Sequence, residues 1–340
     1  MNAISATWLR HLVYAILFAI AGVILVSAVD DFTATQVGTL GAYLCVCMGL
    51  TILIGGNGQI SLGHAALMAV GAYTMAKFLD GRGDAFGLVS IPLVLLGLLL
   101  ATVVATLVGG IIGLAAARLR GPYLAGATLA LGVSVPGVVT YFHHTFNGEQ
   151  GLAVPVPAVP AVLADMQWGI GRLVALIAML CAAVVLFLLA NLKRSGYGRH
   201  LGAVRDHEVA AQLCGLSVPR VQISAFALSS AAAGVGGGLL GMVIQRANPH
   251  SFGLVLSLTM LAVVVIGGLG SLRGAIWGSL IVVGLNKYLS DLEVNDNAPA
   301  ALFGLMLIIV MLAVPGGIQG VVAKLSGRLP RRTPQPQGGN

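Results

Sequence analysis

Charged side chains are scarce in this chain. Asp, Glu, Lys and Arg make up 9% of its 340 residues, whereas they make up about 25% of an ordinary soluble domain. Hydrophobic residues reach 58%, and at least six apolar runs are long enough to cross a hydrocarbon core, which takes about 20 helical residues. These runs do not alternate as the strands of a membrane β-barrel would. The sequence therefore predicts an all-α polytopic membrane protein.

The chain also lacks the residue patterns of several catalytic and binding sites. Its four cysteines, Cys45, Cys47, Cys181 and Cys214, do not have the spacing of a zinc site or a disulfide framework. None of its four lysines follows a glycine, so no phosphate-binding Gly-Lys-Ser/Thr loop is present. We therefore expect no catalytic residues, no metal and no cofactor. The chain is predicted to be a non-enzymatic protein that cannot use ATP by itself.

The apolar runs predict about ten membrane helices, some of them broken or re-entrant. The predicted spans are residues 11–29, 38–54, 60–79, 88–117, 121–141, 172–190, 221–244, 254–269, 275–289 and 300–314. Together they form a single predicted domain over residues 1–314. The more polar residues 315–340 are expected to be a disordered tail.

The net charge of +7 has a topological explanation. With ten spans, both termini lie on one side, and that side receives thirteen of the eighteen basic residues and two of the eleven acidic ones. Basic residues accumulate in cytoplasmic loops of membrane proteins. We therefore predict cytoplasmic termini and reject a nucleic-acid partner. The lipid bilayer is the surrounding medium.

Glycines and amides interrupt the apolar sequence between the second and third runs. Residues 55–59 read Gly-Gly-Asn-Gly-Gln, which indicates either a surface turn or a helix break within the membrane. Unwound segments survive in membranes only where protein or a cavity covers them, and transporters often bind substrate beside them. His64 is the only ionisable residue well inside a predicted span. It is either a packed, hydrogen-bonded residue or a residue that contacts the substrate. The candidate substrate path is Asn57, Gln59, Ser61 and His64, with the last three expected on one helix.

A second glycine cluster lies in the seventh predicted span. Gly236, Gly238 and Gly241 match the spacing of a dinucleotide-binding loop, but that motif requires a preceding strand in a soluble βαβ unit. Within a membrane span, glycines allow close helix packing. The sequence favours packing.

The polar segment 191–220 is the exception to the low charge of the chain. It contains seven charged residues in thirty, and on the charge count it is cytoplasmic. Residues 199–214 are expected to form one helix that ends at Gly215. Its apolar residues, Leu201, Val204, Val209 and Leu213, do not form a single stripe, unlike those of a helix that lies on lipid. The segment is predicted to dock a partner protein, although a merely solvated loop remains the alternative.

Several motifs carry a resemblance to a known family. They are GQISLGHAA at 58–66 with GAY at 71–73, RGPYLA at 120–125 with TLA at 128–130, the segment 195–215, and VIGGLGSLR at 265–273. Together they resemble the permease subunits of ATP-binding-cassette importers for branched-chain amino acids, of the LivM type.

This resemblance implies a type II-like importer permease in a bacterial inner membrane. The implied partners are a second, homologous permease, two cytoplasmic ATP-binding subunits and a periplasmic substrate-binding protein. The residues implied in ATPase coupling are Arg199, Arg205, Asp206, Glu208, Ala210, Ala211 and Gly215.

Two departures from the family pattern leave alternatives open. The stretch Thr145–Leu152 lacks a Thr-Gly-Gly-x-x-Gly loop, and Leu131–Ser134 stands where Phe-Gly-Glu is frequent. Related permeases for urea and short amides share most of the pattern, so the solute is expected to be Leu, Ile or Val, or else urea or an amide. A self-contained secondary carrier or channel, with an ion at the glycine break, and a structural scaffold are the rival classes.

Overall fold

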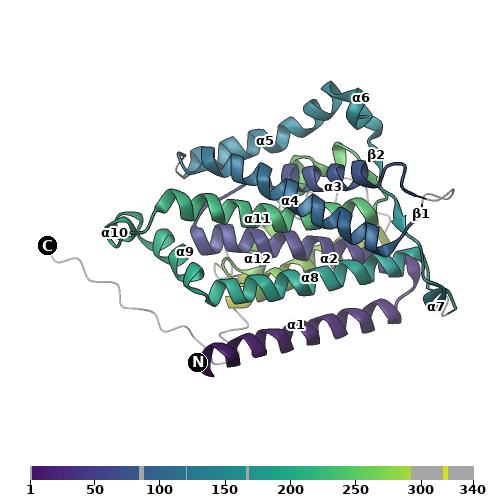
Figure 1. Ribbon diagram of the computed structural model, residues 1–340, viewed down its shortest axis with the longest axis horizontal. Coiled ribbons are helices and arrows are strands. Elements are labelled where there is room, and N and C mark those ends of the chain that lie inside the picture. The colour runs from purple at the N-terminus through teal and green to yellow at the C-terminus, as the bar shows by residue number, and fades with distance from the viewer. Residues whose placement is uncertain (1, 84–87, 120, 166–167, 292–316, 321–340) are drawn as a thin grey trace.

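The computed structural model describes residues 2–83, 88–119, 121–165, 168–291 and 317–320. Long helices run nearly parallel through the molecule, and short helices and strands connect them at both ends (Figure 1). This architecture confirms an all-α polytopic membrane protein.

Seven described segments are long and apolar enough to cross a membrane. They contain α1 (Asn2–Ala28), α2 (Asp31–Thr51) with the π-helix η1 (Ile52–Gly56), α4 (Ile91–Ala116), α5 (Pro122–Tyr141), α8 (Ile170–Arg194), α11 (Val218–Val243), and η3 (His250–Phe252) with α12 (Leu254–Gly267).

Two further long helices, α3 (His64–Leu79) and α13 (Leu272–Asp291), accompany these seven segments. The predicted span 60–79 is wrong at its start, because residues 57–63 are largely irregular and α3 has only 16 residues. The predicted span 300–314 and the predicted disordered tail, apart from residues 317–320, lie outside the described residues.

The short elements lie at the two ends of the bundle. At one end are α6 (His143–Phe146), η2 (Gly148–Gln150), α7 (Ala161–Ala164) and four two-residue strands: β1 (Leu88–Val89), β2 (Leu152–Ala153), β3 (Val156–Pro157) and β4 (Arg246–Ala247). Strand β1 pairs with β3 in parallel, and β2 pairs with β4 antiparallel. At the other end are α9 (Gly196–Asp206) and α10 (Glu208–Leu213) (Figure 1).

Helix α2 is the centre of the fold. It packs against α8, α11, α12 and α13. In the most apolar 18-residue stretch of α2 and η1, 94% of the residues are buried inside the chain. By contrast, only 22% of the residues are buried in the corresponding stretches of α1 and α5, and 28% in that of α4. The apolar side chains on the outer faces of these three helices suit contact with lipid or with another membrane subunit.

The glycines of α11 bring that helix into backbone contact with three neighbours. A Cβ atom at Gly234 would overlap Ala105 of α4, one at Gly236 would overlap Val46 of α2, and one at Gly237 would overlap the carbonyl of Met68 in α3. The packing interpretation of this glycine cluster is therefore confirmed, as expected for small residues at membrane helix interfaces.

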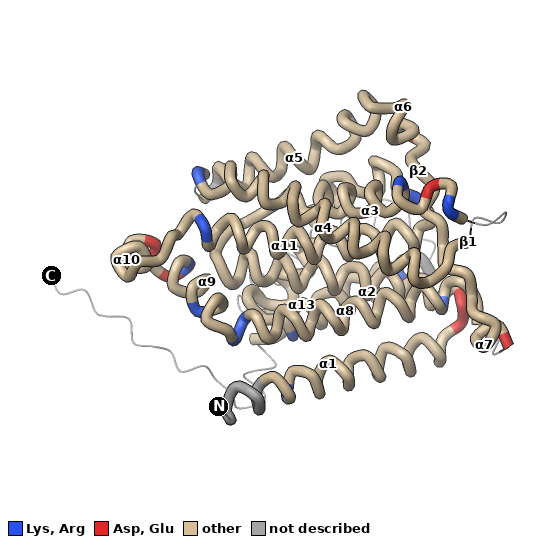
Figure 2. The backbone as a smooth tube through the Cα atoms, viewed as in Figure 1, with Lys and Arg blue, Asp and Glu red and all other residues tan. Residues whose placement is uncertain are grey.

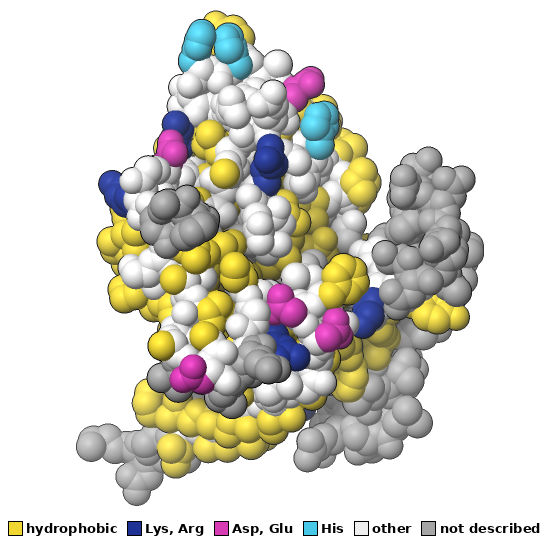
Figure 3. Space-filling view, turned by 90° about the vertical axis from the view of Figure 1, so that its right-hand side faces the viewer, with side chains coloured by type: hydrophobic (Ala, Val, Ile, Leu, Met, Phe, Trp, Pro, Cys, Tyr) yellow, Lys and Arg dark blue, Asp and Glu magenta, His cyan; other side chains and the backbone are white. Residues whose placement is uncertain are grey.

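Charge divides the bundle into two different ends. Lys and Arg of the 191–220 segment gather at the end formed by α9 and α10, where Asp206 and Glu208 are the described acidic residues (Figure 2). The opposite end mixes acidic, basic and histidine side chains (Figure 3). Its described acidic residues include Asp30, Asp31, Asp80, Glu149 and Asp165.

Candidate functional site

The chain between α2 and α3 is a broken helix. After η1 it turns at Gly58, which has a φ of +78°, and it stays largely irregular until α3 begins at His64. Gly58 and Ile60 are exposed, whereas Asn57 and Gln59 are 4% and 6% exposed. The segment therefore starts as a turn at the α9 end and then re-enters the bundle. A simple surface turn does not describe it.

The four candidate path residues form two polar pairs along this segment. Asn57 Nδ2 donates to Gln59 Oε1 at 2.8 Å, and Ser61 Oγ lies 3.0 Å from His64 Nδ1. The expectation that Gln59, Ser61 and His64 share one helix is wrong, since α3 begins only at His64. The glycines at 55, 56, 58 and 63 are the physical reason, because glycine is a poor helix former.

Three other helices bind the end of the unwound segment and the start of α3. His64 Nε2 lies 2.7 Å from Ser229 Oγ of α11, Thr128 Oγ1 of α5 accepts from the Leu62 amide at 3.0 Å, and Ser257 Oγ of α12 accepts from the Ala65 amide at 3.1 Å. From Val218 at the start of α11 to Ser229 the helix rises about 16 Å, roughly half of a hydrocarbon core of about 30 Å. The N-terminus of α3 is thus held at mid-depth by hydroxyl groups. Sequence reasoning did not identify Thr128, Ser229 or Ser257.

An apolar cavity lies beside this region, between α3, α4 and α5. Its volume is about 630 Å³, and its few polar lining residues include Thr74, Lys77 and Ser134. Tyr73 also lines it, with its ring 5.2 Å from that of Phe146 in an edge-to-face contact. The cavity has room for a small solute with an aliphatic side chain.

The polar segment 191–220 forms two short helices instead of one. The expected helix 199–214 is interrupted at His207, whose extended backbone (φ −159°, ψ 96°) separates α9 from α10. This break explains the missing apolar stripe. Leu201 and Val204 of α9 are each 2% exposed, whereas Val209 and Leu213 of α10 are 61% and 85% exposed.

Helix α9 is fastened to the membrane bundle. Besides the buried Leu201 and Val204, the Tyr197 hydroxyl lies 2.7 Å from Ser224 Oγ of α11. Burial raises the pKa of Tyr197 above its ordinary value. These contacts make α9 a part of the membrane domain that can transmit a displacement.

Helix α10 is the outermost part of the segment (Figure 1). Glu208 Oε1 accepts from Gln222 Nε2 of α11 at 3.0 Å, and Gly215, with φ +82°, ends the helical segment as expected. Val209 and Leu213 are four residues apart, which places both on one face of the helix. This exposed apolar pair is a docking candidate that sequence reasoning missed, although its spacing was visible in the sequence.

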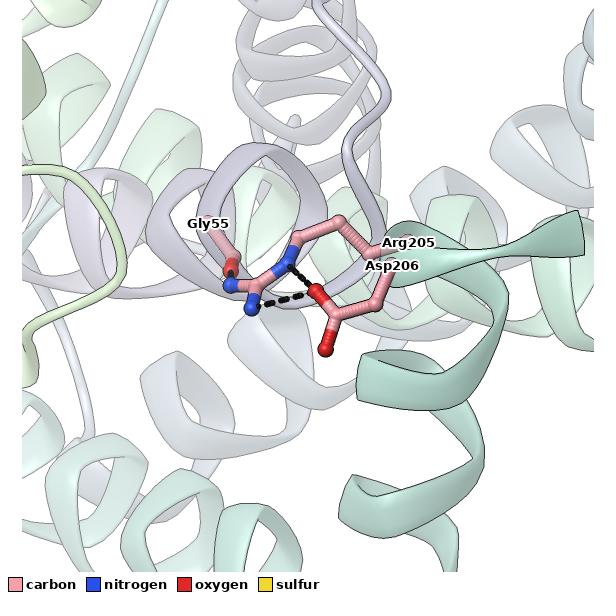
Figure 4. Close-up of polar contacts among 3 residues, drawn as sticks. All are labelled: Gly55, Arg205 and Asp206. Carbon is pink, nitrogen blue, oxygen red and sulfur yellow. Dashed lines mark hydrogen bonds and ion pairs between the residues drawn. The ribbon is translucent and has the colours of Figure 1, made fainter. Parts of the chain in front are cut away.

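Arg205 reaches from α9 to the end of η1, while 45% of its side chain stays exposed. Its Nη1 donates to the carbonyl of Gly55 at 2.6 Å, and its Nε and Nη2 donate to Asp206 Oδ1 at 2.9 and 2.8 Å (Figure 4). The last carbonyls of a helix lack intrahelical partners, and basic side chains bind them favourably. Arg205 therefore caps the end of η1 from α9.

A second basic side chain completes this junction. Lys193, at the end of α8, donates to the carbonyl of Gly270 in the turn between α12 and α13. Gly55 lies directly against Gly270, because a Cβ atom at Gly55 would overlap the Gly270 backbone. We call Gly55, Gly270, Lys193, Arg205 and Asp206 the inner junction.

The remaining coupling candidates are distributed around α9 and α10. Arg199, Asp206 and Ala210 are exposed, whereas Ala211 is buried. Among the described residues, no group of three or more His, Cys, Asp or Glu side chains could hold a metal ion.

Comparison with known proteins decides the family. Residues 32–315 match the family described as branched-chain amino acid transport system / permease component. The chain belongs to this family. The permease is 29% identical over 329 residues to the high-affinity branched-chain amino acid transport system permease protein LivM of Escherichia coli (strain K12), covering 90% of this chain and 74% of the relative.

Two other relatives extend this picture. LivH of the same Escherichia coli strain is 27% identical over 301 residues, covering 83% of the permease and 92% of LivH. A probable LivM of Methanocaldococcus jannaschii is 24% identical over 315 residues, covering 82% of the permease and 90% of that relative. No solved structure matches the permease. The predicted resemblance to LivM-type permeases is confirmed.

Proposed function

We propose that the permease is the membrane-spanning subunit of an ATP-driven importer for branched-chain amino acids. The observation that carries this proposal is the family match over residues 32–315. The α9–α10 segment supports it, because a protein without a nucleotide site needs a surface through which other subunits can supply energy. Its exposed Val209 and Leu213 and its cluster of charges form such a surface.

The proposed assembly follows from the two kinds of relative. The permease is similar to both LivM and LivH, which supports pairing with a second, related permease of its own. Two ATP-binding subunits dock at the α9–α10 end, and a substrate-binding protein docks at the opposite end. We further propose ten spans in a type II-like arrangement. The basic α9–α10 end and both termini are then cytoplasmic in the inner membrane.

The apolar cavity between α3, α4 and α5 suits a small solute without net charge. The cavity between α3, α4 and α5 is lined mainly by aliphatic and aromatic side chains, which favours leucine, isoleucine or valine over polar solutes. Urea and short amides also lack net charge, but they offer little apolar surface to such a lining.

Uptake by intact cells tests the solute class. Deletion of the gene is expected to abolish high-affinity uptake of labelled leucine, and the gene in trans is expected to restore it. Excess isoleucine or valine should compete with leucine in the complemented strain, while urea and acetamide should not. Unchanged leucine uptake with a loss of urea or amide uptake would reassign the solute. Unchanged uptake of every solute would favour a structural scaffold.

A further inference from the structure

We infer that Arg205 is a positioning residue that transmits movement of the ATPase-docking segment to the broken helix at 57–63. The inference rests on the proposed function, because it presumes that ATP-binding subunits move α9 and α10. It assigns Arg205 an internal role in place of direct contact with an ATPase.

The hydrogen bonds of Arg205 in the described part of the structure all lie within this chain, although 45% of its side chain is exposed. The guanidinium donates to the Gly55 carbonyl from Nη1 and to Asp206 Oδ1 from Nε and Nη2. Its aliphatic part covers the turn at Gly58, where an added Cβ atom would lie 3.1 Å from Arg205 Cγ. One side chain thus contacts the broken helix both before and after residue 57.

Among the described residues, Arg205 supplies the hydrogen bond to the carbonyl of Gly55. The amides of Gly58 and Gln59 donate to the carbonyls of Ile54 and Leu53 at 3.0 and 3.3 Å, and Arg205 donates to the carbonyl of Gly55. A displacement of α9 therefore acts on the last peptide of η1 through a charge-assisted hydrogen bond, which is stronger than a neutral one.

The broken helix can carry that displacement into the membrane. Between Gly58 and His64 the backbone has no regular helical hydrogen bonds, so it resists bending less than a helix would. Its far end is held by Ser229, Thr128 and Ser257, which belong to three different helices. Movement at Gly55 is thereby directed to the contacts of Ser61 and His64.

The test combines three measurements on the assembled importer in proteoliposomes. Docking is measured by co-purification of the ATP-binding subunits, and coupling by stimulation of ATP hydrolysis by the loaded binding protein. Movement of the broken helix is measured by the rate at which a maleimide labels cysteine in an Ile60→Cys variant, because Ile60 is 48% exposed. That rate is compared with and without ATP and vanadate in a chain otherwise free of cysteine.

Arg205→Gln is expected to keep the ATP-binding subunits bound but to reduce stimulated hydrolysis and leucine uptake at least tenfold. It should also abolish the nucleotide-dependent change in labelling at position 60. Arg205→Lys retains a charged donor. It is expected to restore part of the transport activity and part of the nucleotide-dependent change in labelling. Arg118→Gln removes an exposed charge at the same end but outside the 191–220 segment, and it should behave as the unaltered chain.

Three results would overturn the inference. Release of the ATP-binding subunits by Arg205→Gln would place Arg205 in the docking contact. An unchanged labelling response in Arg205→Gln would show that the broken helix moves without it. Equal loss in Arg205→Gln and Arg205→Lys, with both variants folded, would show that a charged donor is not what matters. Failure of the unaltered chain to bind any ATP-binding subunit would instead overturn the proposed function.

Discussion

At the scale of single residues, Glu208 is the most informative side chain of the docking segment. Removing one partner of a desolvated, hydrogen-bonded charge pair costs about 2–5 kcal/mol. If Glu208 binds an ATP-binding subunit, Glu208→Ala should therefore lower the affinity of docking about 30-fold or more. The membrane helices should stay folded, and the affinity can be measured by titrating the purified ATP-binding subunit.

The matched control for Glu208 is Gln222→Ala. This variant removes the 3.0 Å bond between α10 and α11 but leaves the carboxylate in place, so it should largely preserve docking. Equal losses in the two variants would mean that Glu208 acts only by holding α10 against α11. Full docking and uptake in Glu208→Ala would show that the segment is only a solvated loop, where a charge contributes almost nothing to binding.

Leu213 should contribute apolar contact to the same interface. Its side chain is 85% exposed in the isolated chain, and full burial of such a side chain stabilises a complex by about 1.5–3 kcal/mol. Leu213→Ser is expected to weaken docking about tenfold or more without changing the melting temperature of the permease. The neighbouring exposed Cys214 provides the control, since Cys214→Ser should dock normally. Unimpaired docking of Leu213→Ser would show that α10 is not part of the interface.

Ser61 tests whether the broken helix meets the solute. It is 1% exposed and lies beside His64, so Ser61→Cys in a chain free of other cysteines should label slowly with a water-soluble thiol reagent at rest. We expect faster labelling during turnover and protection by leucine. Ser230→Cys is the control, because Ser230 is equally buried but packs against α4. No labelling of position 61 in any state would assign the residue to packing.

At the scale of elements, the inner junction makes a specific prediction about two adjacent glycines. Gly55 lies against the backbone of Gly270, whereas the nearest atoms to a Cβ at Gly56 are 3.7 Å away. Gly55→Ala must push the broken helix away from the α12–α13 turn and should strongly reduce transport. Gly56→Ala should be tolerated, and leucine uptake at matched expression distinguishes the two. Equal uptake by both variants would contradict the close contact.

The elements also show how far the sequence could be interpreted. Long apolar runs predicted α1, α4, α8 and α11 well, because lipid requires continuous helices. The break at His207 was not predicted, since it depends on α9 packing Leu201 and Val204 on the bundle while α10 projects outward. The mid-depth start of α3 was also missed, because it depends on hydroxyl groups from distant helices such as Ser229 of α11.

At the scale of the whole molecule, composition and motifs were sufficient to predict the fold class and the family. They could not reveal the contact between Arg205 and Gly55, and the family resemblance alone implied an ATPase-coupling role for Arg205. Only the tertiary structure brings Arg205 to the carbonyl of Gly55, 150 residues away in the sequence. Side-chain direction, unlike hydropathy, is determined by how separate segments pack.

We propose that the permease imports branched-chain amino acids by using energy from separate ATP-binding subunits. The direct measurement is uptake of labelled leucine into proteoliposomes that contain the permease, its related permease and the ATP-binding subunits, with loaded binding protein outside and ATP inside. We expect uptake only with all components and ATP present, and none with the permease alone under a proton or sodium gradient. Gradient-driven uptake by the permease alone would identify a secondary carrier and contradict the account.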